Sequence, residues 1–396
     1  MPNTSFSGLL VVAIAAFLAP LLLGLSPVRR LPSVVLEIML GILIGPSVLG
    51  WVRVDVPIQI LSVLGLAFLL FLAGLEVELD RLKGRLLVFV ASGFLLSFAL
   101  ALLVGFVLYL TGQVLSPLYI AIVLVATALG IVVPLLKDAG ESDSSFGQLV
   151  IAGAMFAEFG SIILLSLFFS REATSTGTKL VLLAGFILLA AAFAFVVLRL
   201  EGLMRLATVF QRLQDTTAQL RVRGAFMLLI GFVALASALG LETILGAFIA
   251  GVLLRLVDQD RMMTHLKFRQ KLEAVGFGIF IPVFFVSSGL NFNLAALLMS
   301  PETILRVPVF LIALLLVRGI PALLYRPLVG GRRSVIAGLF QATSLSFIVA
   351  ATQIGLELHL ITTATSAALV ASGLLSVLIF PITALTLLRQ KKDTMY

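Results

Sequence analysis

Long apolar runs follow one another along almost the whole chain, and they constrain the fold more than any other feature. A helix needs about 20 apolar residues to cross a hydrocarbon core roughly 30 Å thick. Thirteen runs of about this length, bounded by charge, Pro or Gly, can be marked along the sequence. The predicted spans are residues 8–25, 31–50, 57–76, 86–111, 116–137, 145–170, 178–198, 223–239, 241–257, 274–290, 303–325, 334–356 and 359–388. The fold class predicted from them is all-α, a polytopic membrane protein.

Composition agrees with a membrane protein and excludes several kinds of site. Of the 396 residues, 61% are hydrophobic and only 12% are charged, which is too apolar for a soluble protein. The chain has no cysteine, so disulfides and thiolate metal sites are excluded. Its two histidines, His265 and His359, are too few and too far apart for a histidine metal cluster. We therefore expect no cofactor.

The positive charge of the chain indicates topology rather than a nucleic-acid partner. The net charge is +8, and most of the 27 Lys and Arg residues lie in alternate loops between the predicted spans. Lys and Arg accumulate on the cytoplasmic side of membrane proteins. Because the number of spans is odd, this pattern predicts an N-terminus outside and a C-terminus in the cytoplasm. Residues 199–223 and 258–273 are predicted to be basic amphipathic helices on the cytoplasmic surface.

The loop pattern also predicts an inverted repeat. Six spans in residues 1–170 begin and end outside, and six spans in residues 223–388 begin and end inside. Residues 171–222 are then a linking span with an amphipathic helix, and residues 389–396 are a cytoplasmic tail. In transporters built this way, the binding site usually lies near the midplane, where two interrupted helices meet. We therefore expect two crossing discontinuous helices.

The interruptions are expected in the fifth and twelfth spans. Residues 125–134 combine Thr127, Gly130 and Pro134, a set that weakens a helix and leaves backbone groups free. Residues 340–353 contain a polar cluster suited to receiving an ion. Its members are Gln341, Thr343, Ser344 and Ser346. The alternative is that these small polar residues ease close helix packing. Their matching positions in the two repeats favour a binding site.

Glu158 is an acidic residue that lies too deep in its predicted span for water to solvate its side chain. It lies in the middle of the span at residues 145–170, roughly 20 Å from either end at about 1.5 Å per residue. Acidic residues elsewhere in the spans lie within reach of an interface. A charged side chain inside a membrane span is costly, so it indicates an ion or proton path.

Arg318 is a basic residue inside a predicted span. It lies about 12 Å from the cytoplasmic end of the span at residues 303–325. One interpretation is that its long side chain reaches the interface. The other is that Arg318 and Glu158, in equivalent spans of the two repeats, are partners within the membrane.

Several stretches resemble the bacterial monovalent cation/proton antiporters, in the branch that contains the sodium/proton exchangers and the Kef-type potassium efflux systems. They are "RLPSVVLEIMLGILIGPSVLGW" (30–51), "LGLAFLLFLAGLEVELDRLK" (64–83), "LGLETILGAFIAGVLL" (239–254) and "FIPVFFVSSGLNFNL" (280–294). The resemblance runs from about residue 8 to 388. It implies a homodimer in the bacterial inner membrane, with a scaffold from spans one to three and eight to ten. Spans four to six and eleven to thirteen would form a mobile core.

Carried over by residue, the resemblance places Glu158 where the family has its cation- and proton-binding aspartate. Arg318 falls at the family's basic position, and Thr127 at the polar position of the first crossing helix. Two departures stand out. Ala157 precedes Glu158 where the family often has Asp, Asn or Gln, and Leu345-Ser346-Phe347 stands where many members have Gly-Glu-Phe. Two side-chain ligands of the family site are thus missing.

The predicted function is exchange of H⁺ for a monovalent cation, Na⁺ or K⁺, by alternating access. Glu158 would bind either one, helped by Thr127, Gln341, Thr343 and Ser346, with Arg318 as charge partner. One carboxylate beside a guanidinium that stays protonated predicts an electroneutral cycle. The alternative is a cation channel or uniporter of the same fold without proton coupling. An organic-anion symporter is disfavoured by the lone carboxylate. An enzyme is disfavoured because the spans lack a carboxylate pair or a Ser/His set at matching depth.

Overall fold

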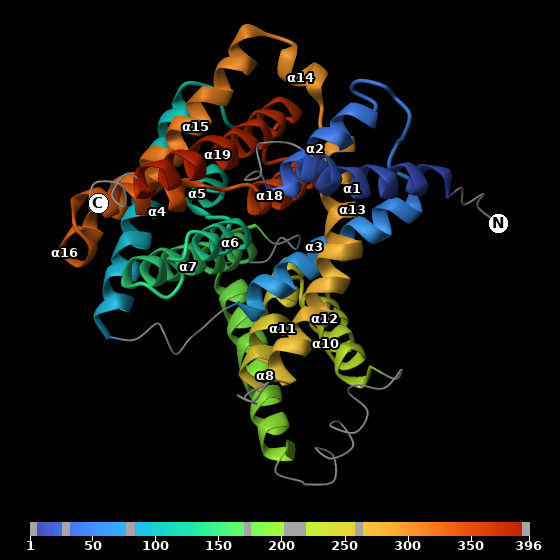
Figure 1. The fold of residues 1–396 in the computed structure, drawn as a ribbon, viewed down its shortest axis with the longest axis vertical. Helices are drawn as coiled ribbons and strands as arrows, with labels where there is room; N and C mark the ends of the chain where they lie inside the picture. Colours follow the sequence, from blue (N-terminus) through green and yellow to red (C-terminus); the bar gives the residue numbers. More distant parts are fainter. Residues whose placement is uncertain are drawn as a thin grey trace. The chain divides into compact units, whose positions relative to one another are not determined.

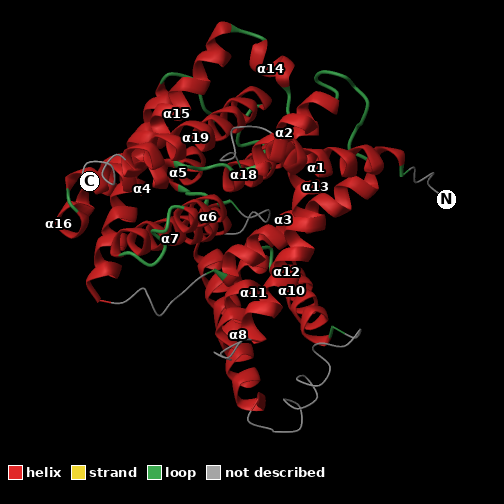
Figure 2. Cartoon of the chain, in the orientation of Figure 1, coloured by secondary structure: helices red, strands yellow, loops and turns green. Residues whose placement is uncertain are grey.

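A computed structural model describes residues 6–25, 32–76, 84–169, 176–201, 219–257 and 264–389. Within these ranges the chain is helical and contains no strand, as Figure 2 shows. Ten helices in them are long and apolar enough to cross a membrane. Three shorter apolar helices lie at Ser33–Ile44, Leu180–Phe193 and Thr243–Leu256. Each of the predicted spans therefore contains an apolar helix, and the chain is an all-α, multi-pass membrane protein.

The helices follow in chain order, with labels as in Figure 1. They are α1 (Ser7–Leu25), α2 (Ser33–Ile44), α3 (Val56–Leu75), α4 (Gly84–Leu110), α5 (Pro117–Val125), α6 (Leu129–Asp138), α7 (Ser145–Phe168), α8 (Thr176–Glu201), α10 (Leu220–Ala238), α11 (Thr243–Val257), α12 (Thr264–Val275), the π-helix η2 (Gly276–Phe280), α13 (Ile281–Leu290), α14 (Leu294–Leu298), α15 (Pro301–Ala322), the 3-10 helix η3 (Leu323–Tyr325), α16 (Arg326–Val329), α17 (Gly331–Ala342), α18 (Ser346–Glu357) and α19 (Thr363–Arg389).

Local sequence signals fix the beginnings of two helices in the site region. Ser116 precedes α5 and its hydroxyl accepts a hydrogen bond from the Tyr119 amide at 3.4 Å, with Pro117 as the first helical residue. Ser300 precedes α15 in the same way, with Pro301 following it. A hydroxyl at the N-cap satisfies an amide that has no partner within the helix, and proline at the first position needs no partner. Both helices therefore start where the sequence directs.

The residues divide into two compact units. The first unit comprises Met1–Leu10, Val54–Val77 and Leu165–Ser287. Its helices α3, α8, α10, α11 and α12 are labelled in Figure 1, and α3 packs closely against α11. A Cβ atom added at Gly74 or Gly251 would overlap the backbone of the opposite helix, so glycine is required for this approach.

The second unit comprises Val11–Arg53, Glu78–Leu164 and Ser288–Tyr396. It contains the helices of the predicted spans four to six and eleven to thirteen, except for the end of α7 from Leu165 onward, which belongs to the first unit. In this unit α15 packs against α4, α5, α17 and α19. Most of α1 and all of α2 also belong to the second unit. This division differs from the scaffold expected from the resemblance, in which spans one to three would group with eight to ten.

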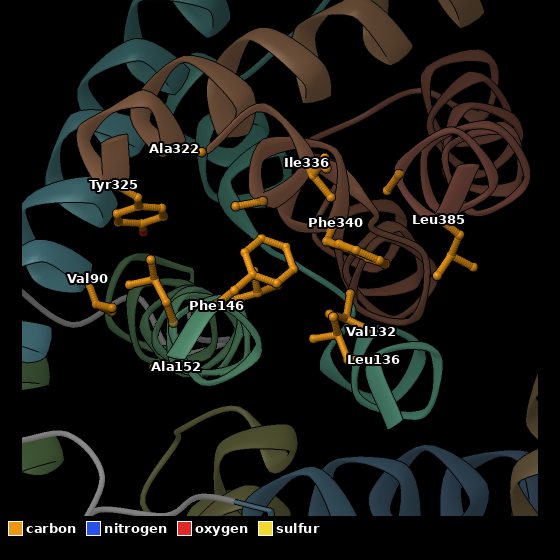
Figure 3. Packing of buried hydrophobic residues seen from close by; sticks show 14 residues of the cluster. Val90, Val132, Leu136, Phe146, Ala152, Ala322, Tyr325, Ile336, Phe340 and Leu385 are labelled. Carbon is orange, nitrogen blue, oxygen red and sulfur yellow. The ribbon is translucent and has the colours of Figure 1, made fainter. Parts of the chain in front are cut away.

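A hydrophobic cluster holds six helices of the second unit together. Figure 3 shows Phe146 of α7 beside Ile336 and Phe340 of α17, with Val132 and Leu136 of α6 nearby. All five side chains are at most 1% exposed. Further members come from α4, α7, α15, η3, α17 and α19; they are Val90, Leu149, Val150, Ala152, Ala322, Tyr325, Ala337, Ala384 and Leu385. Burying an aromatic or large aliphatic side chain stabilises a fold by about 1.5–3 kcal/mol. The cluster thus fixes α6, α7 and α17, which carry the candidate site.

Some boundaries differ from the sequence prediction. Gly130 and Pro134 were expected to help break the fifth span, but both lie inside α6. Val132 and Leu136 are fully buried on that helix, and their packing offsets the hydrogen bond that Pro134 lacks. The predicted amphipathic helix at 258–273 is helical over Thr264–Val275, where the structure describes it. The other, at 199–223, lies mostly outside the described residues.

Candidate functional site

The first break separates α5 from α6. Helix α5 ends at Val125 and α6 begins at Leu129, and Ala126 has an extended conformation with φ −68° and ψ 150°. Ala126, Thr127 and Ala128 are all completely buried. Buried backbone amides and carbonyls that leave a helix need other partners. The break therefore creates free backbone groups deep inside the second unit.

The second break separates α17 from α18. Helix α17 ends at Ala342, and α18 begins at Ser346. Thr343, the first residue of the break, has extended backbone with φ −72° and ψ 112°. The hydroxyl of Thr343 donates to the Leu339 carbonyl at 3.1 Å, so this side chain is used within its own helix. The Thr343 hydroxyl keeps its lone pairs in this bond, and its predicted role as an ion ligand stays a prediction.

The two breaks are hydrogen-bonded to each other. The Ala128 amide donates to the Thr343 carbonyl at 2.9 Å. The Thr127 hydroxyl donates to the Gln341 carbonyl at 2.7 Å. These bonds join segments that are more than 200 residues apart in sequence, and they supply the partners that the interrupted helices lack. The predicted crossing of two discontinuous helices is confirmed.

Glu158 reaches this crossing from α7. Its side chain is 4% exposed, and its Oε2 accepts a hydrogen bond from the Leu129 amide at 3.0 Å. Leu129 is the first residue of α6. The N-terminus of a helix carries unpaired amides and a partial positive charge, which favours a carboxylate. The half-helix α6 therefore points its positive end at Glu158.

Arg318 binds the same break from α15. The residue is 2% exposed, and each guanidinium nitrogen has a described partner. Nε donates to the Thr127 hydroxyl at 3.0 Å, and Nη1 donates to the Ser97 hydroxyl at 3.1 Å. Nη2 donates to the Gly153 carbonyl at 3.3 Å. Since Gly153 lies on α7 and Thr127 lies two residues before Leu129, Arg318 and Glu158 hold opposite ends of one short polar segment. Their direct pairing stays a prediction.

Gln341 extends the polar region toward the hydrophobic cluster. Its Nε2 donates to the Tyr325 hydroxyl at 3.4 Å. A Cβ atom on Gly153 would overlap the Gln341 side-chain amide, so the absence of a side chain at Gly153 leaves room for this amide between α7 and α17. Ser346, the remaining predicted ligand, begins α18 and is 7% exposed. No hydrogen bond in the described part of the chain joins Ser346 to Glu158 or Arg318.

Two serines of the site were missed by sequence reasoning. Ser97 of α4 is fully buried and accepts from Arg318. Ser376 of α19 accepts from the Ser344 amide at 3.1 Å, and its one hydroxyl proton is shared between the Ser344 carbonyl at 2.9 Å and the Gly373 carbonyl at 2.8 Å. It therefore satisfies both backbone groups of one residue in the second break. A single serine within an apolar run is the available signal, and it does not distinguish such a role from helix packing.

Comparisons with known proteins agree on one family. The family model for the transmembrane part of sodium/hydrogen exchangers matches residues 13–390. YjbQ of Bacillus subtilis (strain 168) is 33% identical over 96% of this chain and 63% of its own length. The Na(+)/H(+)-K(+) antiporter GerN of Bacillus cereus is 29% identical over 66% of this chain and 65% of its own length. The chain therefore spans less than two thirds of either relative.

A solved structure has the same fold. The sodium proton antiporter MjNhaP1 from Methanocaldococcus jannaschii at pH 8 superposes with a TM-score of 0.69. The match covers 96% of this chain and 97% of that chain, with 18% sequence identity. At this identity the likeness shows the fold alone.

Proposed function

Because the chain belongs to the sodium/hydrogen exchanger family, we propose that it exchanges H⁺ for a monovalent cation, with Glu158 binding either one. The observation that carries this proposal is the position of Glu158. A buried carboxylate accepts an amide hydrogen bond at the start of a half-helix, where two interrupted helices cross. Sites at such crossings bind the coupling ions of transporters with inverted repeats.

A single carboxylate is sufficient for exchange. The carboxylate is neutral after it binds one H⁺, and it is also neutralised by one bound monovalent cation. Competition between the two ions for Glu158 prevents both from being carried together. Among the residues that the structure describes, no group of three His, Cys, Asp or Glu side chains lies close enough to hold a metal ion. The proposed ligands of the cation are the Glu158 carboxylate and neutral oxygens.

The charge of Arg318 leads to an electroneutral cycle. Arginine stays protonated in proteins, so the site as a whole carries no net charge when Glu158 is ionised. Loading H⁺ or one monovalent cation adds the same single charge in either case. The transport step that carries H⁺ and the transport step that carries the cation then move equal charge across the membrane in opposite directions. We expect exchange of one H⁺ for one cation, insensitive to an imposed membrane potential.

The remaining features of the proposal come from the sequence and from the resemblance. The distribution of Lys and Arg favours an N-terminus outside and a C-terminus in the cytoplasm. We infer a homodimer in the inner membrane of a bacterium, as the resemblance implies. Na⁺ and K⁺ both stay candidates, since the name of GerN includes both ions.

The test is proton movement in liposomes driven by a cation gradient. Glu158→Gln keeps the size of the side chain and its hydrogen-bonding groups but removes the titrating oxygen. We expect this variant to insert and to show no exchange with Li⁺, Na⁺, K⁺ or Rb⁺. Glu37→Gln is the matched control, because Glu37 of α2 is equally buried at 4% exposed and lies outside the helices that form the two breaks. This control should keep exchange.

Two outcomes would contradict the proposal. Cation-driven proton movement that persists in Glu158→Gln would show that another group binds the ions. Cation flux through the wild-type protein without any proton flux would show a channel or uniporter instead.

A further inference from the structure

Two serine hydroxyls near Glu158 have no hydrogen-bond partner. In the described part of the chain, Ser161 of α7 and Ser344 of the second break are both fully buried. The Oγ atom of each is buried and accepts or donates no hydrogen bond. Leaving a buried hydroxyl unsatisfied is costly, and such groups in a native structure point to a functional role or to a bound ion or water.

Other buried serines of the same unit do not behave this way. Ser372 of α19 donates to the carbonyls of Val307 and Ala368 at 2.9 and 2.6 Å. A serine in a helix has such a carbonyl available one turn earlier. Ser161 lies within α7 and does not use it. Its hydroxyl is thus available to something other than the backbone.

The position of Ser161 relates it directly to Glu158. Residues three apart on a helix lie on the same face, with their Cβ atoms about 5–6 Å apart. Ala154, Ser161, Ile162 and Leu165 share this face of α7 with Glu158, and all four are completely buried. The Ser161 hydroxyl and the Glu158 carboxylate therefore belong to one buried stripe, in which both are the polar members.

Ser344 is related to the same carboxylate through the hydrogen bonds of the crossing. It follows Thr343, whose carbonyl accepts from the Ala128 amide. The next amide along the chain, that of Leu129, donates to Glu158. The backbone amide and carbonyl of Ser344 are occupied by Ser376, which leaves the Ser344 hydroxyl as the free oxygen of this segment.

We propose that the hydroxyls of Ser161 and Ser344 are neutral ligands that complete the coordination of the cation at Glu158. The inference rests on the proposed function and names ligands for its site. Hard cations are bound by oxygen atoms, and a hydroxyl oxygen offers lone pairs without adding charge. The two serines thus supply oxygens in a site where Ala157 provides none. Because both are neutral, they affect cation affinity without changing the charge carried in the cycle.

The test measures the cation KM and kcat of exchange for Ser161→Ala and Ser344→Ala. Each variant should raise KM about tenfold, equivalent to about 1.4 kcal/mol of binding, with kcat within about twofold of the wild-type value. Ser344→Ala keeps the backbone contacts to Ser376. Ser161→Thr and Ser344→Thr keep an oxygen at each position, so they should stay close to the wild-type KM. Ser372→Ala is the matched control and should leave KM unchanged.

A second readout does not depend on transport. The Tm of purified protein is measured in detergent while NaCl or KCl replaces choline chloride at constant ionic strength. Wild-type protein should gain stability with the cation, and each alanine variant should need about tenfold more cation for the same gain. In choline chloride alone, Tm should not fall, because the alanine removes a hydroxyl without partners.

The results separate this inference from the proposed function. Wild-type KM and wild-type cation stabilisation in both alanine variants would overturn the serine ligands while leaving exchange at Glu158 intact. An equal KM increase in Ser372→Ala, or threonine variants that behave like alanine, would also overturn them. Absence of exchange in the wild-type protein would instead remove the proposed function, and the Tm series would still report on the ligands.

Discussion

The two broken helices of the second unit are interrupted over equal lengths but are stabilised by different groups. At the first break, the Thr127 hydroxyl accepts from the Arg318 guanidinium, and the Leu129 amide donates to the Glu158 carboxylate. At the second break, the backbone of Ser344 is held by the neutral hydroxyl of Ser376. Hydrogen bonds to charged groups are roughly twice as strong as neutral ones. The first break is thus held by ionisable groups, whereas the backbone of the second break is held by a neutral hydroxyl.

This difference indicates that the two breaks respond differently to the charge of Glu158. A change of charge at Glu158 acts directly on the first residue of α6. The second break is affected by this change of charge only indirectly, through the hydrogen bonds from Thr127 and Ala128 to the carbonyls of Gln341 and Thr343. Substitution of a group that holds the first break should therefore impair exchange more than substitution of Ser376, which holds the backbone of the second.

The largest effect is expected for Arg318→Gln. It removes three hydrogen bonds and leaves the hydroxyls of Thr127 and Ser97 and the Gly153 carbonyl without their donor. Each unsatisfied buried group costs about 1–3 kcal/mol. We expect exchange in liposomes to fall at least about a hundredfold, which corresponds to about 2.7 kcal/mol, and Tm to fall by several degrees.

Arg306→Gln is the control for this change. Arg306 lies on the same helix, and its Nη1 donates to the Thr365 hydroxyl at 3.2 Å. It should retain most of the exchange activity. Similar losses in both variants would show that any arginine substitution in α15 disrupts the protein.

A smaller effect is expected for Thr127→Val. The side chain keeps its shape but loses the hydroxyl that accepts from Arg318 and donates to Gln341. We predict about a tenfold loss of exchange, since two buried partners lose one bond each of about 0.5–1.5 kcal/mol. Thr127→Ser should restore most of the rate. Thr352→Val removes a hydroxyl that bonds to the Val349 carbonyl within α18, and it should have little effect. A Thr127→Val exchange rate equal to that of the wild type would show that the hydrogen bonds of Thr127 at the first break are not needed for transport.

The smallest effect is expected for Ser376→Ala. It leaves the amide and carbonyl of Ser344 without their described partner, but no charged group is involved. We expect Tm to fall and exchange to decrease by no more than about threefold, with the cation KM unchanged. Ser372→Ala provides the comparison on the same helix. A loss from Ser376→Ala that exceeds the loss from Thr127→Val would reverse the ranking of the two breaks.

The sequence predicts the breaks and the charged residues because both are anomalies in an apolar run. Glu158 and Arg318 are costly inside a span, and clustered hydroxyls mark the places where the helices open. Gly130 and Pro134 were expected to help break the helix, but the packing of Val132 and Leu136 keeps α6 helical at both positions. Local propensity is overridden here by burial.

The sequence alone does not identify the serine hydroxyls that support the site. Ser97, Ser161 and Ser376 are each one serine among apolar neighbours, and packing serines have the same appearance. Their partners are tens to hundreds of residues away, as for Ser97 and Arg318, or absent, as for Ser161. The three-dimensional contacts are needed to distinguish them.

The central claim is that one proton competes with one cation for Glu158, and the most direct measurement is the cation KM of wild-type exchange as a function of pH. If a single carboxylate is shared, KM rises about tenfold for each unit that pH falls on the acid side, while kcat at saturating cation stays constant. A KM independent of pH would show that H⁺ and the cation bind at different groups. A rise of about a hundredfold per unit would show that two protons are displaced, and it would contradict the account.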